Sequence, residues 1–172
     1  MSAQRGMALL ASLVFMLLLG VIGMASMASA ARQEKMAAGV QHVNHSFQAA
    51  EAALRSGESW LDSEWSAVSG CASPVTCSPP IEARTQASPA TDPVSGVRWV
   101  SVADGLYGIQ NLGQSVAPAH LPAPTATHLY RVTGIGLRGQ SRTVLESIYA
   151  RYQGAEEAAP HRFRRVMWRQ LQ

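Results

Sequence analysis

The sequence predicts an α+β protein in which a long N-terminal helix, its first half transmembrane, packs on a C-terminal antiparallel β-sheet. Uncharged residues run without interruption from Met7 to Ala31, and apolar residues then recur at helical spacing among polar ones. Beyond residue 97, short segments alternate apolar and polar residues as strands do. The expected parts are a polar leader (1–6), a membrane-spanning half-helix (7–31), an amphipathic half-helix (32–67) and a globular domain with Pro-rich loops (68–172).

The uncharged segment is long enough to cross a membrane, because a helix needs about 20 apolar residues to span a hydrocarbon core about 30 Å thick. Its leader is very short and ends in Arg5-Gly6. This junction indicates a processing site between Gly6 and Met7, since glycine offers a protease an extended, unhindered backbone. A conventional secretory signal cleaved after the triplet Ala28-Ser29-Ala30 is an alternative, although its apolar region would exceed the usual 7–15 residues.

The segment after Arg32 has the pattern of an amphipathic helix, with apolar residues at steps of three and four. We expect this apolar seam to pack the helix against the sheet, and the helix to end near residues 68–70. Glu58 and Asp62 belong to the intervening polar positions. The seam consists of Met36, Val40, Val43, Phe47, Ala50, Leu54, Gly57 and Leu61.

The two cysteines, Cys71 and Cys77, lie in a Pro/Ser-rich stretch. In an oxidising compartment we expect a disulfide that closes a small loop and contributes roughly 2–3 kcal/mol. A zinc site would need two further ligands, and no histidine lies nearby in the sequence. The Pro-rich residues 69–97 are expected to form surface loop.

Five strands are expected. They are residues 97–102 and 106–110 around an Asp-Gly turn, 128–134 and 141–152 joined through residues 135–140, and a last strand over 162–171. A basic amphipathic helix on a membrane is the alternative for the last segment. Its arginines are expected either to pair with carboxylates of a neighbouring subunit or to form a solvated face; they are Arg162, Arg164, Arg165 and Arg169.

Composition and spacing give no sign of an enzyme, a cofactor or a metal. A formal net charge of +3 is too small to indicate nucleic-acid binding. His42 and His45 share a helix face, but a metal would need a third ligand such as Glu51 from another chain. No arrangement of nucleophile and base is visible, so we expect a structural protein.

Three groups of residues carry a resemblance to a known family. They are Arg5-Gly6-Met7-Ala8-Leu9-Leu10, Gln33 to Ala37, and Phe47 to Leu54, with further similarity in Leu129 to Thr133, Val144 to Ser147 and Met167 to Leu171. These segments resemble the PilX family of type IV pilus minor pilins.

The resemblance implies a pilin-like fold and a pilus-assembly function. It implies that a prepilin peptidase cuts after Gly6 and methylates the amine of Met7. It implies an inner-membrane protein with a single span and a periplasmic C-terminal domain that later joins the tip of the pilus. The implied partners are other minor pilins, the major pilin, the prepilin peptidase, a tip adhesin and, before assembly, membrane lipid, with no nucleic acid.

One position departs from the pilin pattern. Most type IV pilins carry a glutamate five residues into the mature chain, where this sequence has Ala11. We expect a subunit that does not dock by the usual charge pair and that primes or caps the fibre at its tip. Small residues such as Ala11, Gly20 and Gly23 would let neighbouring helices pack closely. The alternatives are a periplasmic binding or sensor domain on a permanent anchor, and a tip pseudopilin of a type II secretion filament.

Overall fold

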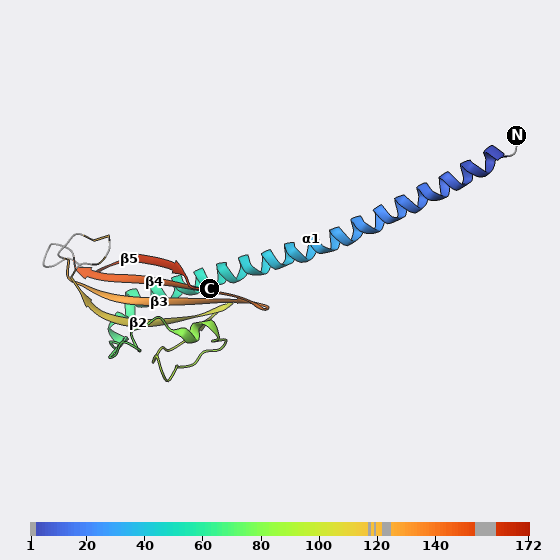
Figure 1. Ribbon diagram of the computed structural model, residues 1–172. Helices are drawn as coiled ribbons and strands as arrows, with labels where there is room; N and C mark the ends of the chain where they lie inside the picture. The colour runs from blue at the N-terminus through green and yellow to red at the C-terminus, as the bar shows by residue number, and fades with distance from the viewer. Residues whose placement is uncertain (1–2, 117, 119, 122–124, 154–160) are drawn as a thin grey trace. The chain divides into compact units, whose positions relative to one another are not determined.

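The computed structural model describes residues 3–116, 118, 120–121, 125–153 and 161–172. Helix α1 (Ala3–Glu64) is followed by the short 3-10 helices η1 (Trp65–Ala67) and η2 (Ile81–Arg84). The strands are β1 (Val100–Val102), β2 (Gly105–Ser115), β3 (Thr127–Arg138), β4 (Ser141–Gln153) and β5 (His161–Gln170). This succession, drawn in Figure 1, confirms the predicted α+β class.

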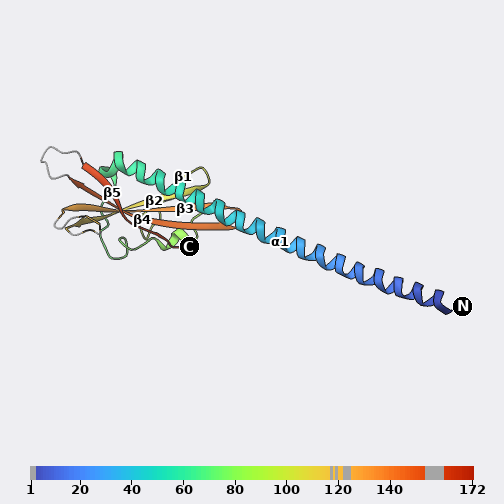
Figure 2. The same ribbon diagram turned by 90° about the horizontal axis from the view of Figure 1, so that it is seen from above.

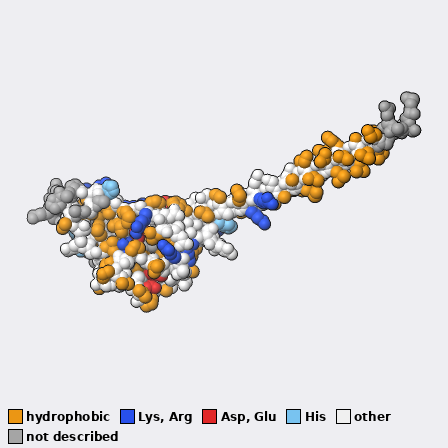
Figure 3. Space-filling view, in the orientation of Figure 1, with side chains coloured by type: hydrophobic (Ala, Val, Ile, Leu, Met, Phe, Trp, Pro, Cys, Tyr) orange, Lys and Arg blue, Asp and Glu red, His pale blue; other side chains and the backbone are white. Residues whose placement is uncertain are grey.

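The chain divides into two compact units, residues 1–41 and 42–172. The first unit consists of the N-terminal part of α1, and its large apolar side chains from Met7 to Met27 are all exposed. Figure 3 shows these side chains covering the visible surface of the helix. The Ser12 and Ser26 hydroxyls donate to carbonyl oxygens three and four residues earlier, at 2.9 and 3.0 Å. These bonds satisfy the two hydroxyls within the helix, as an apolar environment requires.

The second unit contains a five-stranded antiparallel sheet in the order β1-β2-β3-β4-β5. Its longest ladder joins β3 and β4, with Arg138 opposite Ser141. Only Gly139 and Gln140 connect them, and Gly139 has a φ of 59°, a value that glycine adopts at little cost. The expected connection over residues 135–140 is therefore wrong: β3 continues through Ile135 to Arg138, because these residues pair along β4.

The other expected strands differ from the structure in extent. Strand β1 begins at Val100 rather than Val97, and β2 continues past Gln110 to Ser115. The last segment is strand β5, so the alternative of a membrane-surface helix there is wrong. The long helix ends at Glu64, and η1 continues the chain to Ala67.

One face of the sheet is covered by residues of α1, whose C-terminal end crosses the strands in Figure 2. The buried cluster between them comprises Ala50, Leu54, Leu61, Tyr130, Val132 and Leu145, with Phe47 partly buried against it. Gly134 brings β3 so close that a Cβ added there would lie 2.5 Å from the Ala50 carbonyl oxygen. Small residues therefore set the distance between helix and sheet.

The expected seam is only partly buried. Met36, Val40 and Val43, which were expected in this seam, are 71%, 60% and 55% exposed. The sheet ends at its β3–β4 turn, where a Cβ added to Gly139 would lie 4.0 Å from Nδ1 of His42.

The opposite face of the sheet is covered by the Pro-rich segment before β1. Its second buried cluster joins Ala83, Val97 and Trp99 to sheet residues Leu106, Ile135 and Val144. Arg142 donates from NH1 to the carbonyl oxygens of Gln86 at 2.7 Å and Ala83 at 3.2 Å. The expected surface loop therefore also forms a third layer of the domain.

Candidate functional site

The predicted processing position lies near the start of α1. Gly6 is within the helix, and the side chain of Met7 is exposed. Farther along, a Cβ added to Gly20 or Gly23 would meet nothing within 4 Å. The apolar surface of this part of the helix needs no hydrogen bonds beyond those within the helix. Lipid or similar apolar helices are therefore suitable surroundings for it.

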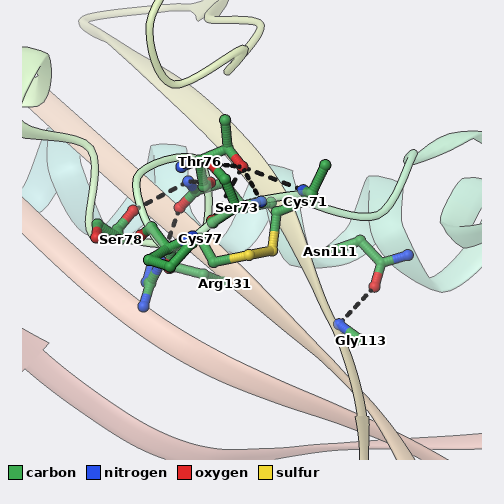
Figure 4. The surroundings of a disulfide bond; sticks show 11 residues. Cys71, Ser73, Thr76, Cys77, Ser78, Asn111, Gly113 and Arg131 are labelled. Carbon is green, nitrogen blue, oxygen red and sulfur yellow. Dashed lines mark hydrogen bonds between the residues drawn. A yellow bond between two sulfur atoms is a disulfide. The ribbon is translucent and has the colours of Figure 1, made fainter.

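Cys71 and Cys77 form a disulfide with their Cα atoms 5.2 Å apart. The loop between them has its own hydrogen bonds, since the amides of Ala72 and Ser73 donate to Oγ1 of Thr76 at 3.1 and 3.0 Å. Figure 4 shows these bonds beside the two sulfur atoms. The loop therefore has a fixed shape that places its carbonyl oxygens.

Those carbonyl oxygens attach the disulfide loop to the sheet. Nε2 of Gln110 on β2 donates to the carbonyl oxygens of Thr76 at 2.7 Å and Ser78 at 3.0 Å. On β3, NH1 of Arg131 donates to the Cys77 carbonyl oxygen at 2.7 Å and to Oε1 of Gln110 at 3.0 Å. Two neighbouring strands thus hold this segment through three hydrogen bonds, and a fourth joins the two strand side chains to each other.

Beside this loop lies a buried carboxylate between two arginines. The side chain of Glu146 is fully buried, with Oε2 at 3.1 Å from Nε of Arg131 and Oε1 at 2.9 Å from NH2 of Arg169. Burial lowers the pKa of Arg131, against the attraction of Glu146, which raises it. Each oxygen of this buried carboxylate therefore has an arginine nitrogen beside it to offset the cost of burying the charge.

A second carboxylate joins the helix to the sheet. Glu58 is 6% exposed, and its Oε1 accepts from Oγ of Ser147 at 2.6 Å and Nε of Arg165 at 2.8 Å. Its Oε2 accepts from NH2 of Arg165 at 2.5 Å. The hydrogen bond to Glu58 is the main reason that the pKa of Arg165 is raised.

These contacts correct the expectation for the C-terminal arginines. Arg165 and Arg169 pair with carboxylates of their own chain, so neither of the two expected roles applies to them. Arg162 and Arg164 are exposed. For these two residues, pairing with a neighbouring subunit and a solvated face both stay predictions.

Glu58 was missed by the sequence analysis. Helical spacing contained the signal, because Glu58 follows Leu54 by four residues and precedes Leu61 by three.

The two histidines named in the sequence analysis do not form a metal site within the part of this chain that the structure describes. Glu51, named as a third ligand, receives a bond from NH2 of Arg55 at 3.3 Å instead. Within the described ranges, no three His, Cys, Asp or Glu side chains lie close enough together to hold a metal ion.

The long apolar helix followed by an antiparallel sheet defines a pilin-like α+β arrangement. Residues 5–55 match the family model described as PilX N-terminal. This match is consistent with a minor pilin of the PilX family at the level of the family, and pilins are structural proteins. No curated protein and no solved structure matches the chain.

The family match and the helix together indicate membrane anchoring. The helix from Met7 to Ala67 is long and apolar enough to cross a membrane, and its N-terminal part overlaps the matched residues 5–55. The match ends within α1, so the sheet and its covering loop are described by the structure alone.

Proposed function

We propose that this protein is a minor pilin that primes or caps type IV pilus assembly at the fibre tip, together with other minor pilins. The observation that carries the proposal is that residues 5–55 match the PilX N-terminal family over a helix whose apolar side chains are uncovered. Before assembly, the segment from Met7 to Ala31 anchors the subunit in the inner membrane with its C-terminal domain in the periplasm. On assembly, the same surface leaves lipid and packs against helices of the major pilin and of other minor pilins.

Processing is the first step of this proposal. The prepilin peptidase cuts between Gly6 and Met7 and methylates the new amine. The cut removes Arg5 together with the original N-terminal amine and leaves a single positive charge, on the methylated amine of Met7.

Placement at the tip follows from Ala11. A glutamate here would cost roughly 2.5–3.5 kcal/mol in the hydrocarbon centre unless a partner neutralised it. Alanine avoids this cost and also lacks the attraction to the amine of a neighbouring subunit. A subunit without this attraction suits the end of the fibre, where no earlier subunit lies above it. A tip adhesin would bind at this end.

Mass spectrometry of the mature chain tests the function. We expect a protein that has lost residues 1–6 and gained one methyl group, and that is present in sheared pili. A Gly6→Val variant, which places a branched side chain at the cut, should keep its leader and stay in the membrane. An intact Met1 together with absence from pili would contradict the proposal and would support an anchored binding or sensor domain.

Immunogold labelling tests the placement. Wild-type protein should lie at fibre ends, and Ala11→Glu should spread some label along the fibre. Label spread along the fibre for both chains would refute the placement at the tip. Presence in a type II secretion filament instead of pili would support the pseudopilin alternative.

A further inference from the structure

Two adjoining hollows lie between the C-terminal turns of α1 and strand β1. Their volumes are about 430 and 620 Å³, and both are lined by Trp60, Val100 and Tyr107. We call this continuous surface the Trp60 groove. Each volume falls within the range of about 300–1,000 Å³ that is typical of binding pockets.

The middle of the Trp60 groove is apolar. Trp60 is 37% exposed although it lies on the domain rather than on the membrane segment. Val68 and Ile109 extend the apolar lining at one end. A partly exposed tryptophan beside aliphatic side chains is the kind of surface that anchors a large apolar side chain of a partner.

Each end of the Trp60 groove has an arginine side chain. Arg98 lines one end and Arg55 the other, and no acidic residue lines either hollow. Arg98 is exposed and forms no ion pair with any residue that the structure describes, whereas Arg55 bonds to Glu51 at the surface. Arg98 is also close enough to lower the pKa of Tyr107, against the larger effect of burial, which raises it. The groove therefore complements negative charge.

The third side of the groove is the edge of the sheet. Strand β1 is the terminal strand and pairs only with β2 among the described strands. Ser101 and Val102 of this strand line the larger hollow. An extended peptide can add to such an edge through backbone hydrogen bonds while its side chains fill a neighbouring groove.

We propose that the Trp60 groove binds an extended acidic peptide segment of another protein, with a large apolar side chain on Trp60 and carboxylates beside Arg98 and Arg55. Apolar burial supplies most of the affinity, and the exposed charges add a smaller part that depends on salt. The inference uses residues 55–109 alone and does not depend on the chain being a pilus subunit.

Binding of a defined peptide to the full chain in phosphatidylcholine nanodiscs tests the proposal. The probe is acetyl-Glu-Val-Phe-Val-Glu-amide with fluorine on the phenylalanine ring, observed by ¹⁹F NMR. We expect a saturable shift at millimolar peptide, and a clearly smaller effect for the matched peptide with lysines in place of both glutamates. Neutral lipid is used so that the membrane does not attract either peptide.

Substitutions locate the binding site. Trp60→Ala should weaken binding at least about tenfold. Arg98→Gln should weaken it about two- to fivefold and reduce its salt dependence. The matched controls are Trp168→Ala, which removes a tryptophan of similar exposure on β5, and Arg84→Gln, which removes an exposed arginine of η2. Both controls should change affinity less than about twofold, with circular dichroism unchanged throughout.

Three results would overturn the proposal. They are the absence of saturable binding, equal binding of the acidic and basic peptides, and equal loss of binding in the Trp60 and Trp168 variants. Self-association of the unliganded chain that Trp60→Ala abolishes would also overturn it, because a second copy would then be the occupant.

Discussion

Glycines of β3 allow the backbone of helix α1 to lie directly against the sheet. A Cβ added to Gly136 would overlap the carbonyl oxygen of Ser46 and the amide nitrogen of Ala50. Both atoms belong to backbone that cannot rotate away as a side chain can. Close contact of this kind fixes the height of the helix above the strands, which decides how Leu54 and Leu61 fill the core.

Gly136→Ala should therefore destabilise the domain by at least about 2 kcal/mol, because the helix must move away from the sheet. Urea unfolding of the full chain in detergent, followed by tryptophan fluorescence, measures this change. Gly70→Ala is the control, since a Cβ there meets nothing within 4 Å, and it should stay within about 0.5 kcal/mol of wild type. Equal stability of the two variants would contradict the close packing.

A second prediction concerns Asp62, one turn after Glu58. Burial, and then the charge of Glu58, raise the pKa of Asp62 above its usual 3.8. A raised pKa means that the folded state favours the protonated form, so stability is lost as pH rises from about 3.8 through the folded pKa. Asp62→Asn should therefore be more stable than wild type at pH 7, and this difference should vanish under strongly acidic conditions.

Asp92 provides the control of opposite sign for the same pH series. Hydrogen bonds from the backbone amides of Ser95 and Val94, each 2.8 Å long, lower the pKa of Asp92. Its contribution to stability is present above pH 3.8 and is lost as pH falls through the folded pKa. Asp92→Asn should be less stable than wild type at pH 7. If both variants were more stable than wild type at pH 7, or both less stable, this interpretation of the two carboxyl groups would be refuted.

The residue types predicted some of the contacts between helix and sheet but gave no sign of others. Phe47, Leu54 and Leu61 were expected at the helix–sheet contact, and the structure buries Leu54 and Leu61 fully and Phe47 partly. Glu58 was grouped with polar positions, because a carboxylate at the core is costly unless a partner is known. Its partner Arg165 is 107 residues away. Spacing along a helix gives no information about which distant strand will supply that partner.

At the scale of elements, the disulfide loop is the connection between the Pro-rich segment and the sheet. It supplies the carbonyl oxygens of Thr76, Cys77 and Ser78 to side chains of β2 and β3. Arg131 needs such acceptors because its guanidinium is mostly buried beside Glu146. Fixing the loop in advance lowers the entropy lost when these bonds form.

The double variant Cys71→Ser/Cys77→Ser should therefore be less stable than the oxidised wild type by roughly 2–3 kcal/mol. Chemical unfolding with and without dithiothreitol measures this difference. Reductant should destabilise the wild type and leave the double variant unchanged. A wild-type unfolding curve that reductant does not shift would show that the loop holds its place without the disulfide.

Elements with regular spacing were predictable, and the segment that covers the sheet was not. The alternation in residues 141–152 matches β4 almost throughout, and β5 was expected within one residue at each end. The connection was expected over residues 135–140, but Gly136 lies within β3, where the absence of a side chain lets the helix approach. The loop from 69 to 97 has no periodicity, so its contacts through Ala83 and Val97 depend on the finished sheet.

At the scale of the whole molecule, the apolar surface of α1 serves two purposes that can be separated. Phe47, Leu54 and Leu61 contact the sheet, whereas Met36, Val40 and Val43 are exposed. The exposed residues follow Arg32 and Lys35, two charged residues that disfavour burial in hydrocarbon. Three exposed apolar side chains in water favour contact with another subunit.

The triple variant Met36→Ser/Val40→Ser/Val43→Ser should keep the domain's stability within about 1 kcal/mol and reduce the amount of protein in sheared pili. Leu54→Ala is the contrasting variant, because its cavity should cost about 2–5 kcal/mol. Immunoblots of pili and urea unfolding of the same chains separate the two effects. Full incorporation of the triple variant would show that assembly does not use this surface.

The pairing of Glu58 with Arg165 also bears on the order of synthesis. The carboxylate is made early and lies against the sheet, whereas the arginine that neutralises it belongs to β5, which is translated after the other described strands. Arg169 of the same strand completes the surroundings of Glu146. A nascent or prematurely terminated chain would thus have carboxylates without their arginine partners in an incompletely folded core. Quality-control proteases could then distinguish unfinished subunits from finished ones.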